Sequence, residues 1–158
     1  MNESDLRAMR GRVAAKKSGL DLIIGIDPGV NTGFAVWSVA ANKLLRVESM
    51  KAVEAEIEVM NYFTSGVKLH VYVEDTRNLR LPKHMHSKGR ERGAGSVARD
   101  MGRWQDHLEH HGIPHTMTGL SPKEFRVGDD KWFRNKTGWD KRTNDHGRCA
   151  AGVLWGKW

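Results

Sequence analysis

Short apolar runs separated by turn-forming residues dominate the first third of the chain. The run Leu22 to Asp27 is apolar except for its final acid, a pattern typical of a buried central strand whose last residue emerges at the sheet edge. Pro28 to Gly33 is rich in Gly, Pro and Asn, so Phe34 to Ala40 is predicted to return as the second strand of a hairpin. Lys43 to Met50 is predicted to be a third strand. The chain is therefore expected to open with a meander.

A helix and a fourth strand are predicted next. Apolar residues recur at helical spacing in Ala52 to Thr64, and Ser65-Gly66 supplies the stop. These apolar residues are Val53, Ile57 and Met60 and, less regularly, Tyr62 and Phe63. Lys68 to Glu74 is β-branched and aromatic and again ends in an acid, which indicates a strand. Two predicted strands thus end in carboxylates.

A polar, basic segment precedes the second predicted helix. Asp75 to Gly93 is too long and too charged for a simple connector, and we expect it to be mobile without its ligand. Gly95 to His110 has apolar residues at steps of four, three and four, the pattern of an amphipathic helix, and Gly112 ends it. The apolar positions are Val97, Met101, Trp104 and Leu108.

The remainder of the chain completes an α/β pattern. Ile113 to Leu120 is predicted to be a weaker fifth strand, and Lys123 to Arg134 to hold short helical turns. Asn144 is a suitable N-cap for a last helix, Asp145 to Lys157. The order β-β-β-α-β-α-β-α predicts a five-stranded mixed sheet flanked by helices.

Length and composition favour one domain. A chain of 158 residues can bury roughly 70% of its unfolded surface in one core, and we assign that domain to residues 20–158. Residues 1–19 are polar and basic and are expected to form a mobile arm rather than a secretory signal. No apolar run approaches the roughly 20 residues of a membrane-spanning helix. The single cysteine indicates a reducing compartment, so we expect a cytoplasmic protein, with an organellar origin left open.

The charge pattern favours a polyanionic partner. Lys and Arg total 26 against 19 Asp and Glu, a formal net charge of +7. Between residues 77 and 103, eight basic residues face two acids, and such clustering is the signature of nucleic-acid binding rather than of solubility alone. The eight are Arg77, Arg80, Lys83, Lys88, Arg90, Arg92, Arg99 and Arg103.

Two strand-end acids and the last helix form the candidate chemical site. Asp27 and Glu74 end neighbouring predicted strands, and a helix packed across those ends would bring His146 and Cys149 to the same point on one helical face. Carboxylates are the ligands that Mg²⁺ and Mn²⁺ prefer, and a pair of such ions about 4 Å apart activates water and stabilises a leaving oxygen. On position alone, an acid at a strand end is more often a solvated cap.

Three motifs in order resemble a known family. Residues 24–36 read Ile-Gly-Ile-Asp-Pro-Gly-Val-Asn-Thr-Gly-Phe-Ala-Val, residues 73–75 read Val-Glu-Asp, and residues 144–151 read Asn-Asp-His-Gly-Arg-Cys-Ala-Ala. Together they resemble the RuvC-type Holliday junction resolvases of bacteria and phages, over about residues 20–155. The resemblance implies a ribonuclease-H-like fold, a homodimer, two Mg²⁺ ions per site (Mn²⁺ as substitute), and nicking of four-way DNA junctions.

The resemblance also assigns roles to residues. Asp27 and Glu74 match metal ligands, His146 matches a third site position that holds Asp or His in the family, and Cys149 matches the final Asp. A thiol is a soft ligand that suits zinc better than Mg²⁺, so little or no cleavage is expected. Cys149 is either an engineered change or a natural feature of a relative that does not cut DNA. The alternative without a functional role is that Cys149 is simply a small residue buried in a helix.

Further residues are predicted to contact DNA. Lys123 resembles the family's basic residue that could hold the scissile phosphate, with Lys136 and Lys141 as competitors, although each is as easily a solvated lysine. The basic cluster would line the approach to the metals and provide affinity rather than sequence choice. For Trp132, Trp139, Trp155 and Trp158, core packing is favoured over stacking on unpaired bases or a dimer contact.

Other functions remain as alternatives. A ribonuclease or transposase-like enzyme could use the same acids on the same fold. A junction-binding protein without catalysis is a serious candidate because of Cys149. A sugar-kinase or actin-like ATPase would need a second, similar domain, which 158 residues do not provide.

Overall fold

The computed structural model describes residues 19–79 and 88–157, with the backbone only for residues 88–94. The expected basic arm, apart from Gly19, lies outside the described residues. The elements in chain order are β1 (Leu22–Asp27), β2 (Asn31–Ser38), β3 (Lys43–Lys51), α2 (Ala52–Thr64), β4 (Leu69–Glu74), α3 (Lys88–His110), β5 (His115–Thr118), α4 (Lys123–Val127), α5 (Asp130–Thr137) and α6 (Asp145–Leu154).

The five strands form one mixed sheet in the order β3-β2-β1-β4-β5, which confirms the predicted architecture. The pairs β1–β2 and β2–β3 are antiparallel, whereas β1–β4 and β4–β5 are parallel. In the parallel pair at the centre, Ile26 lies opposite Val73, so the residues that follow each of them emerge side by side. This register sets the geometry of the candidate site.

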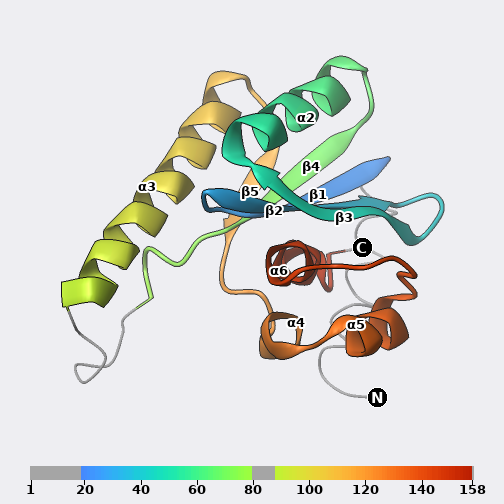
Figure 1. Ribbon diagram of the computed structural model, residues 1–158. Coiled ribbons are helices and arrows are strands. Elements are labelled where there is room, and N and C mark those ends of the chain that lie inside the picture. Colours follow the sequence, from blue (N-terminus) through green and yellow to red (C-terminus); the bar gives the residue numbers. More distant parts are fainter. Residues whose placement is uncertain (1–18, 80–87, 158) are drawn as a thin grey trace.

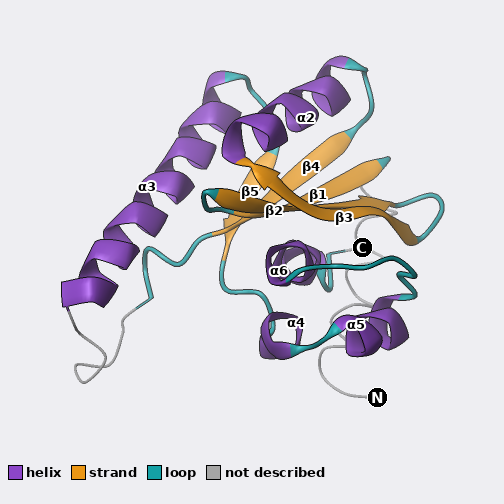
Figure 2. Ribbon diagram, in the orientation of Figure 1, coloured by secondary structure: helices purple, strands orange, loops and turns teal. Residues whose placement is uncertain are grey.

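Helices cover both faces of the sheet. In Figures 1 and 2, α2 and α3 lie on one face and α6 lies on the other, with α4 and α5 on the far side of α6. Each face has its own hydrophobic core. One core joins the sheet to α6 and includes Ile23, Trp37, Phe125 and Phe133. None of the described helices has the length and apolar character needed to cross a membrane.

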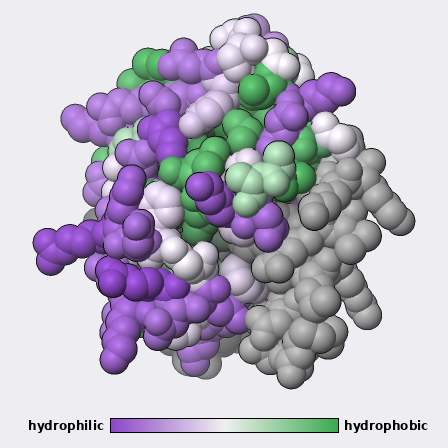
Figure 3. Space-filling model, turned by 90° about the vertical axis from the view of Figure 1, so that its right-hand side faces the viewer, coloured by the Kyte–Doolittle hydropathy of each residue, from purple (hydrophilic) through white to green (hydrophobic). Residues whose placement is uncertain are grey.

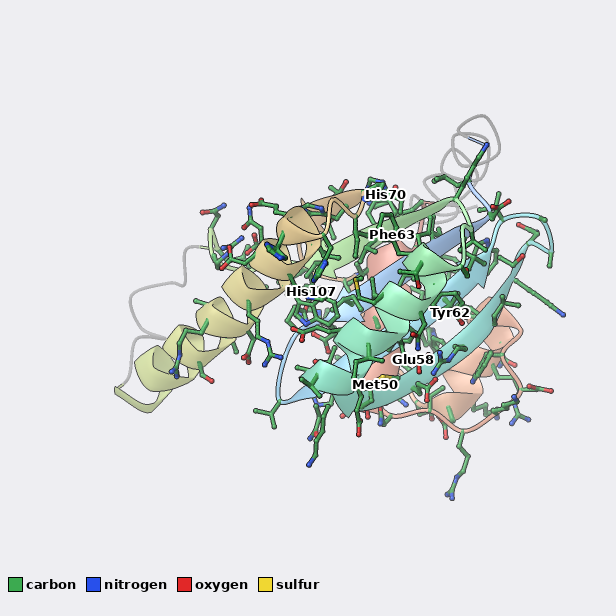
Figure 4. The ribbon with its side chains drawn as sticks, turned by 90° about the horizontal axis from the view of Figure 1, so that it is seen from above. Met50, Glu58, Tyr62, Phe63, His70 and His107 are labelled. Carbon is green, nitrogen blue, oxygen red and sulfur yellow. The ribbon has the colours of Figure 1, made fainter. Side chains whose placement is uncertain are left out.

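The second core lies under α2 and α3. It contains Phe34, Val59, Trp104 and Leu108, and Trp104 is fully enclosed. Figure 4 looks onto this layer and shows His107 of α3 on the side of that helix that faces α2. The core position predicted for Trp104 is therefore correct.

Two helices differ from the sequence expectation. The helix expected at Gly95 begins at Lys88, so the polar connector after Glu74 is shorter than predicted. Val97, placed on the apolar stripe, is 37% exposed, whereas Met101, Trp104 and Leu108 are buried as expected. The first part of α3 extends beyond the sheet (Figure 1), and burial of the apolar stripe begins one turn after Val97, at Met101.

The apolar positions of α2 were also misassigned. Val53 and Ile57 are more than half exposed, and the fully buried side of the helix carries Ala55 and Val59 instead. The last helix ends at Leu154 rather than Lys157, because Gly156 adopts a left-handed conformation that terminates it.

Candidate functional site

Two acids stand at the carboxyl ends of adjacent parallel strands. Asp27 is the last residue of β1, and Glu74 is the last residue of β4. Glu74 is buried, and its Oε1 atom accepts a 2.7 Å hydrogen bond from the backbone N–H of Ser121. The strand ends thus bring together two carboxylates that lie far apart in sequence, as the sequence predicted.

Helix α6 lies directly on the sheet because two glycines leave room for its backbone. A Cβ atom on Gly33 would stand 2.0 Å from the carbonyl oxygen of His146, and one on Gly25 would stand 2.2 Å from that of Ala150. Both distances are far below any van der Waals contact. The two glycines therefore permit the close crossing that carries the first turn of α6 to the strand ends.

His146 meets Asp27 at this crossing. Its Nδ1 atom lies 3.2 Å from the Oδ2 atom of Asp27, within hydrogen-bond distance. The imidazole is about half exposed, whereas the Asp27 side chain is mostly enclosed. His146 therefore forms the solvent side of the site and Asp27 its floor.

The environment of Asp27 strongly alters its ionisation. Burial, the negative charge of Glu74 and a hydrogen bond with Glu74 raise the pKa of Asp27 from 3.8 to about 8. In the absence of a cation, the pair therefore holds a proton at neutral pH. A site that concentrates negative charge in this way is suited to a divalent cation, which would replace that proton.

Cys149 shares the site but carries no charge. Burial raises the pKa of its thiol to about 11, and the charges of Asp27 and Glu74 act in the same direction. Ser121 and Arg126 act in the opposite direction, but burial dominates. At neutral pH this position thus offers a neutral sulfur where the resemblance implies a carboxylate.

The start of α6 is held by a second set of contacts. The Asn144 side chain caps the helix by accepting a 2.9 Å hydrogen bond from the Gly147 N–H, as predicted. Buried Arg148 donates to Thr143 at 2.9 Å and pairs with Asp130 of α5 and with Asp145. The side chain of Asp145 is therefore engaged with Arg148.

The donor set fits a hard cation only in part. Asp27 and Glu74 supply the oxygen ligands that Mg²⁺ and Mn²⁺ prefer, and an imidazole is an acceptable third ligand. The neutral sulfur of Cys149 does not fit. Among the residues that the structure describes, no three His, Cys, Asp or Glu side chains already stand where they could hold a metal together. The carboxylates and the imidazole thus suit a hard cation, whereas the thiol does not.

Two of the predicted DNA-binding arginines are engaged within the protein. Arg77 forms a 2.7 Å ion pair with Asp75 and donates to Gln105 of α3 at 2.6 Å. Arg103 of α3 makes a two-pronged ion pair with Glu56 of α2, with both contacts at 2.8 Å. These residues tie α3 to its neighbours, a role that the sequence pattern did not reveal.

The other described basic residues of the prediction are exposed or lie against tryptophan rings. Lys123, at the start of α4, and Arg99, on α3, are exposed, while Lys136 and Lys141 lie over the rings of Trp155 and Trp139 at 5.0 and 5.5 Å. Arg80 and Lys83 lie outside the described residues, as do the side chains of Lys88, Arg90 and Arg92.

Two residues near the site were missed from the sequence. Ser121 contacts Glu74 through its backbone, and Arg126 is close enough to influence the thiol of Cys149. For Ser121, the sequence offered one signal, the Ser-Pro dipeptide that precedes α4. Trp155 is buried and Trp132 and Trp139 pack against the core, in line with the predicted packing role, while Trp158 lies outside the described residues.

Comparison with known proteins adds no relationship to this picture. No protein-family model matches the chain, and no curated protein matches its sequence. The functional interpretation therefore depends on the site itself and on the motifs that form it.

Proposed function

We propose that this chain binds four-way DNA junctions through a ribonuclease-H-like domain with a divalent-metal nuclease site, and that Cys149 weakens or abolishes cleavage. The observation that carries the proposal is the meeting of Asp27, Glu74 and the first turn of α6 at one end of the sheet. Few structural roles need two mutually repelling carboxyl groups at a partly enclosed point.

The architecture supports this proposal. The strand order β3-β2-β1-β4-β5, with β1 and β4 parallel at the centre, is compatible with a ribonuclease-H-like fold. The motifs that resemble the RuvC-type resolvases fall on the strand ends and on the helix start that form the site. Fold and motif arguments thus agree on the same residues.

Each residue has a distinct part in the proposed site. Asp27 and Glu74 would hold Mg²⁺, and His146 would complete the ligand set from the solvent side. Two such ions, when bound, activate a water molecule and stabilise the leaving oxygen of the phosphodiester. Asp27 would release its proton as the metal binds, because a cation favours the ionised carboxylate.

A non-cleaving junction-binding protein is the second candidate, and Cys149 favours it. A thiol with a pKa of about 11 brings neither the charge nor the hard oxygen of the expected carboxylate. DNA binding does not require this charge. Under this alternative, the chain would recognise junctions as a homodimer and leave their strands intact.

Exposed basic side chains would provide the affinity for DNA. Lys123 and Arg126 belong to α4, which begins two residues after the Glu74 partner Ser121, and Arg99 lies on α3. Contacts of this kind neutralise phosphates and give salt-dependent binding without sequence choice. The net charge of +7 is consistent with such a surface.

Substrate comparison tests the proposal. Binding of the protein to a four-way junction, a linear duplex and an RNA–DNA hybrid of equal length should be measured in chelator over a series of salt concentrations. We expect the junction to bind tightest, and each affinity to fall steeply with salt. Preference for the hybrid would instead favour a ribonuclease.

The proposed homodimer is tested separately, by measuring the molecular mass of the free protein in sedimentation.

A further inference from the structure

A pocket of about 360 Å³ opens between the start of β3 and the loop that joins α5 to α6. Its lining includes Lys43, Leu44, Leu45, Trp139, Asp140 and Lys141. Figure 3 faces the end of the molecule where the β2–β3 connection lies, and shows hydrophobic residues gathered at the centre of that face with hydrophilic residues around them. The volume lies in the range of small-molecule sites, about 300–1,000 Å³.

This pocket is separate from the acidic site. Lys43 pairs with Ser38, which pairs in turn with Leu22 at the first position of β1, whereas Asp27 stands at the last position. Each strand residue advances about 3.3 Å, so the pocket lies roughly 17 Å from the acids along the sheet. A metal ion bound by Asp27 and Glu74 therefore could not also occupy the pocket.

The pocket lining combines the indole of Trp139 with two leucines and two lysines. Trp139 is partly buried against the core, and the ammonium group of Lys141 lies 5.5 Å from the centre of its ring. Leu44 is buried and Leu45 is 40% exposed. A flat ring could stack on Trp139 and Leu45 by displacing the flexible Lys141 side chain, which would leave its charge beside the ligand.

The geometry points to a nucleotide as the ligand of this pocket. The base would stack against Trp139, its phosphate would lie between the ammonium groups of Lys43 and Lys141, and the Asp140 carboxylate could accept a hydrogen bond from an N–H group of the base. The ligand is either an unpaired nucleotide of a DNA strand or a free mononucleotide. This inference rests on the proposed function for its choice of a nucleic-acid component.

Nuclear magnetic resonance titration tests the inference directly. The full chain is titrated in chelator with thymidine monophosphate in one arm and with a single-stranded oligothymidylate in the other. We expect the amide signals of residues 43–45 and 139–141 to shift. A response to the oligonucleotide alone assigns the pocket to a DNA strand, and a response to the mononucleotide alone assigns it to a free nucleotide.

Variants separate pocket binding from general charge. Lys43→Gln combined with Lys141→Gln should weaken the binding that shifts these amides by about tenfold or more, while the exposed pair Lys68→Gln and Lys131→Gln should change it less than about twofold. Trp139→Phe keeps a ring, Trp139→Leu removes it, and only the latter should lose affinity. If Trp139→Leu does not fold, the comparison of the Lys43/Lys141 variant with the Lys68/Lys131 variant still tests the pocket.

Two negative results have different meanings. If four-way junctions bind but no pocket amide moves in either arm, the nucleotide pocket is refuted and the proposed function stands. If the Lys43/Lys141 and Lys68/Lys131 variants lose equal affinity, the nucleotide pocket is also refuted. If the pocket amides move but junctions do not bind better than linear duplex, the proposed function fails and the pocket remains.

Discussion

The Nδ1 atom of His146 lies 3.2 Å from the Oδ2 atom of Asp27, although 119 residues separate the two in sequence. This contact exists because α6 lies against β1 and β2 with no side chain between their backbones at Gly25 and Gly33. The geometry of the candidate site therefore depends on how α6 packs against the sheet. Changes to that packing should alter the site from a distance.

Gly33→Ala should destabilise the fold and separate His146 from Asp27. The new Cβ atom would collide with a backbone oxygen, which cannot rotate away, so α6 must move. We expect a loss of about 1–3 kcal/mol in the free energy of unfolding, the usual range for overpacking. Urea unfolding provides the measurement.

Gly95→Ala is the matched control, since a Cβ atom at Gly95 meets nothing within 4 Å. In the middle of α3, this change should stabilise the protein by about 0.5–1 kcal/mol through helix propensity. Equal stability of the two variants would show that α6 does not depend on close contact at Gly33.

Asp27→Asn should change how stability depends on pH. The pKa of Asp27 is about 8 in the folded protein and 3.8 when unperturbed, so the folded state holds the extra proton between these values. The protonated Asp27 therefore contributes to the free energy of unfolding in full below about pH 4. This contribution is lost as pH rises toward 8, at no more than about 1.4 kcal/mol per pH unit. The asparagine variant should lack this decline when unfolding is followed in chelator.

Asp75→Asn provides a control of opposite sign. Arg77 lowers the pKa of Asp75, so this carboxylate stabilises the fold above its unfolded pKa and loses that effect as pH falls. Its replacement should therefore remove stability at neutral pH rather than add it. If both variants responded to pH in the same direction, the assigned electrostatics of Asp27 would be wrong.

Arg148→Met should loosen the start of α6. The arginine is 7% exposed, donates a hydrogen bond to Thr143 and pairs with Asp130 and Asp145, so its loss removes the contacts that join the start of α6 to α5. We expect a loss of about 1–2 kcal/mol in thermal or urea unfolding, because both aspartates remain hydrated. Exposed Arg99→Met should change stability by less than about 0.5 kcal/mol. A near-neutral Arg148→Met would mean that the helix start is held by its Asn144 cap alone.

Arg99 and Arg103 should differ in their effects on DNA binding. Arg103 is already paired with Glu56 in the free protein, whereas Arg99 is exposed on the same helix. Arg99→Gln should reduce junction affinity and lower the slope of log affinity against log salt by about one. Arg103→Gln should leave that slope unchanged and cost at most about 1 kcal/mol of stability. The reverse pattern would place the DNA on the α2 side of α3.

The fold was largely predictable because its signals are local. Apolar runs marked β1 and β4, and Asn144 marked the start of α6. The boundary of α3 was not predictable, because residues 88–94 are basic and have no apolar periodicity. The exposure of Val53 and Ile57 was also unpredictable. Periodicity identifies a helix, but it does not show which side of that helix packs against the sheet.

The candidate site was predictable in its members but not in its details. Asp27, Glu74 and the first turn of α6 could be grouped from strand ends and a cap. The contacts of Arg77 with Gln105 and of Arg103 with Glu56 could not, because they join residues distant in sequence. The pocket beside Trp139 likewise joins two segments that the sequence keeps far apart.

We propose that Cys149 limits cleavage at the site formed by Asp27, Glu74 and His146, and nicking of a four-way junction by Cys149→Asp in Mg²⁺ tests this claim most directly. Cys149→Ser serves as the uncharged control, and Asp27→Asn combined with Cys149→Asp serves as the metal-ligand control. We expect symmetrical nicks with Cys149→Asp alone. If Cys149→Asp binds junctions like the unchanged chain yet leaves them uncut, the claim is contradicted, and the chain is a binding protein whose loss of cleavage involves more than one ligand.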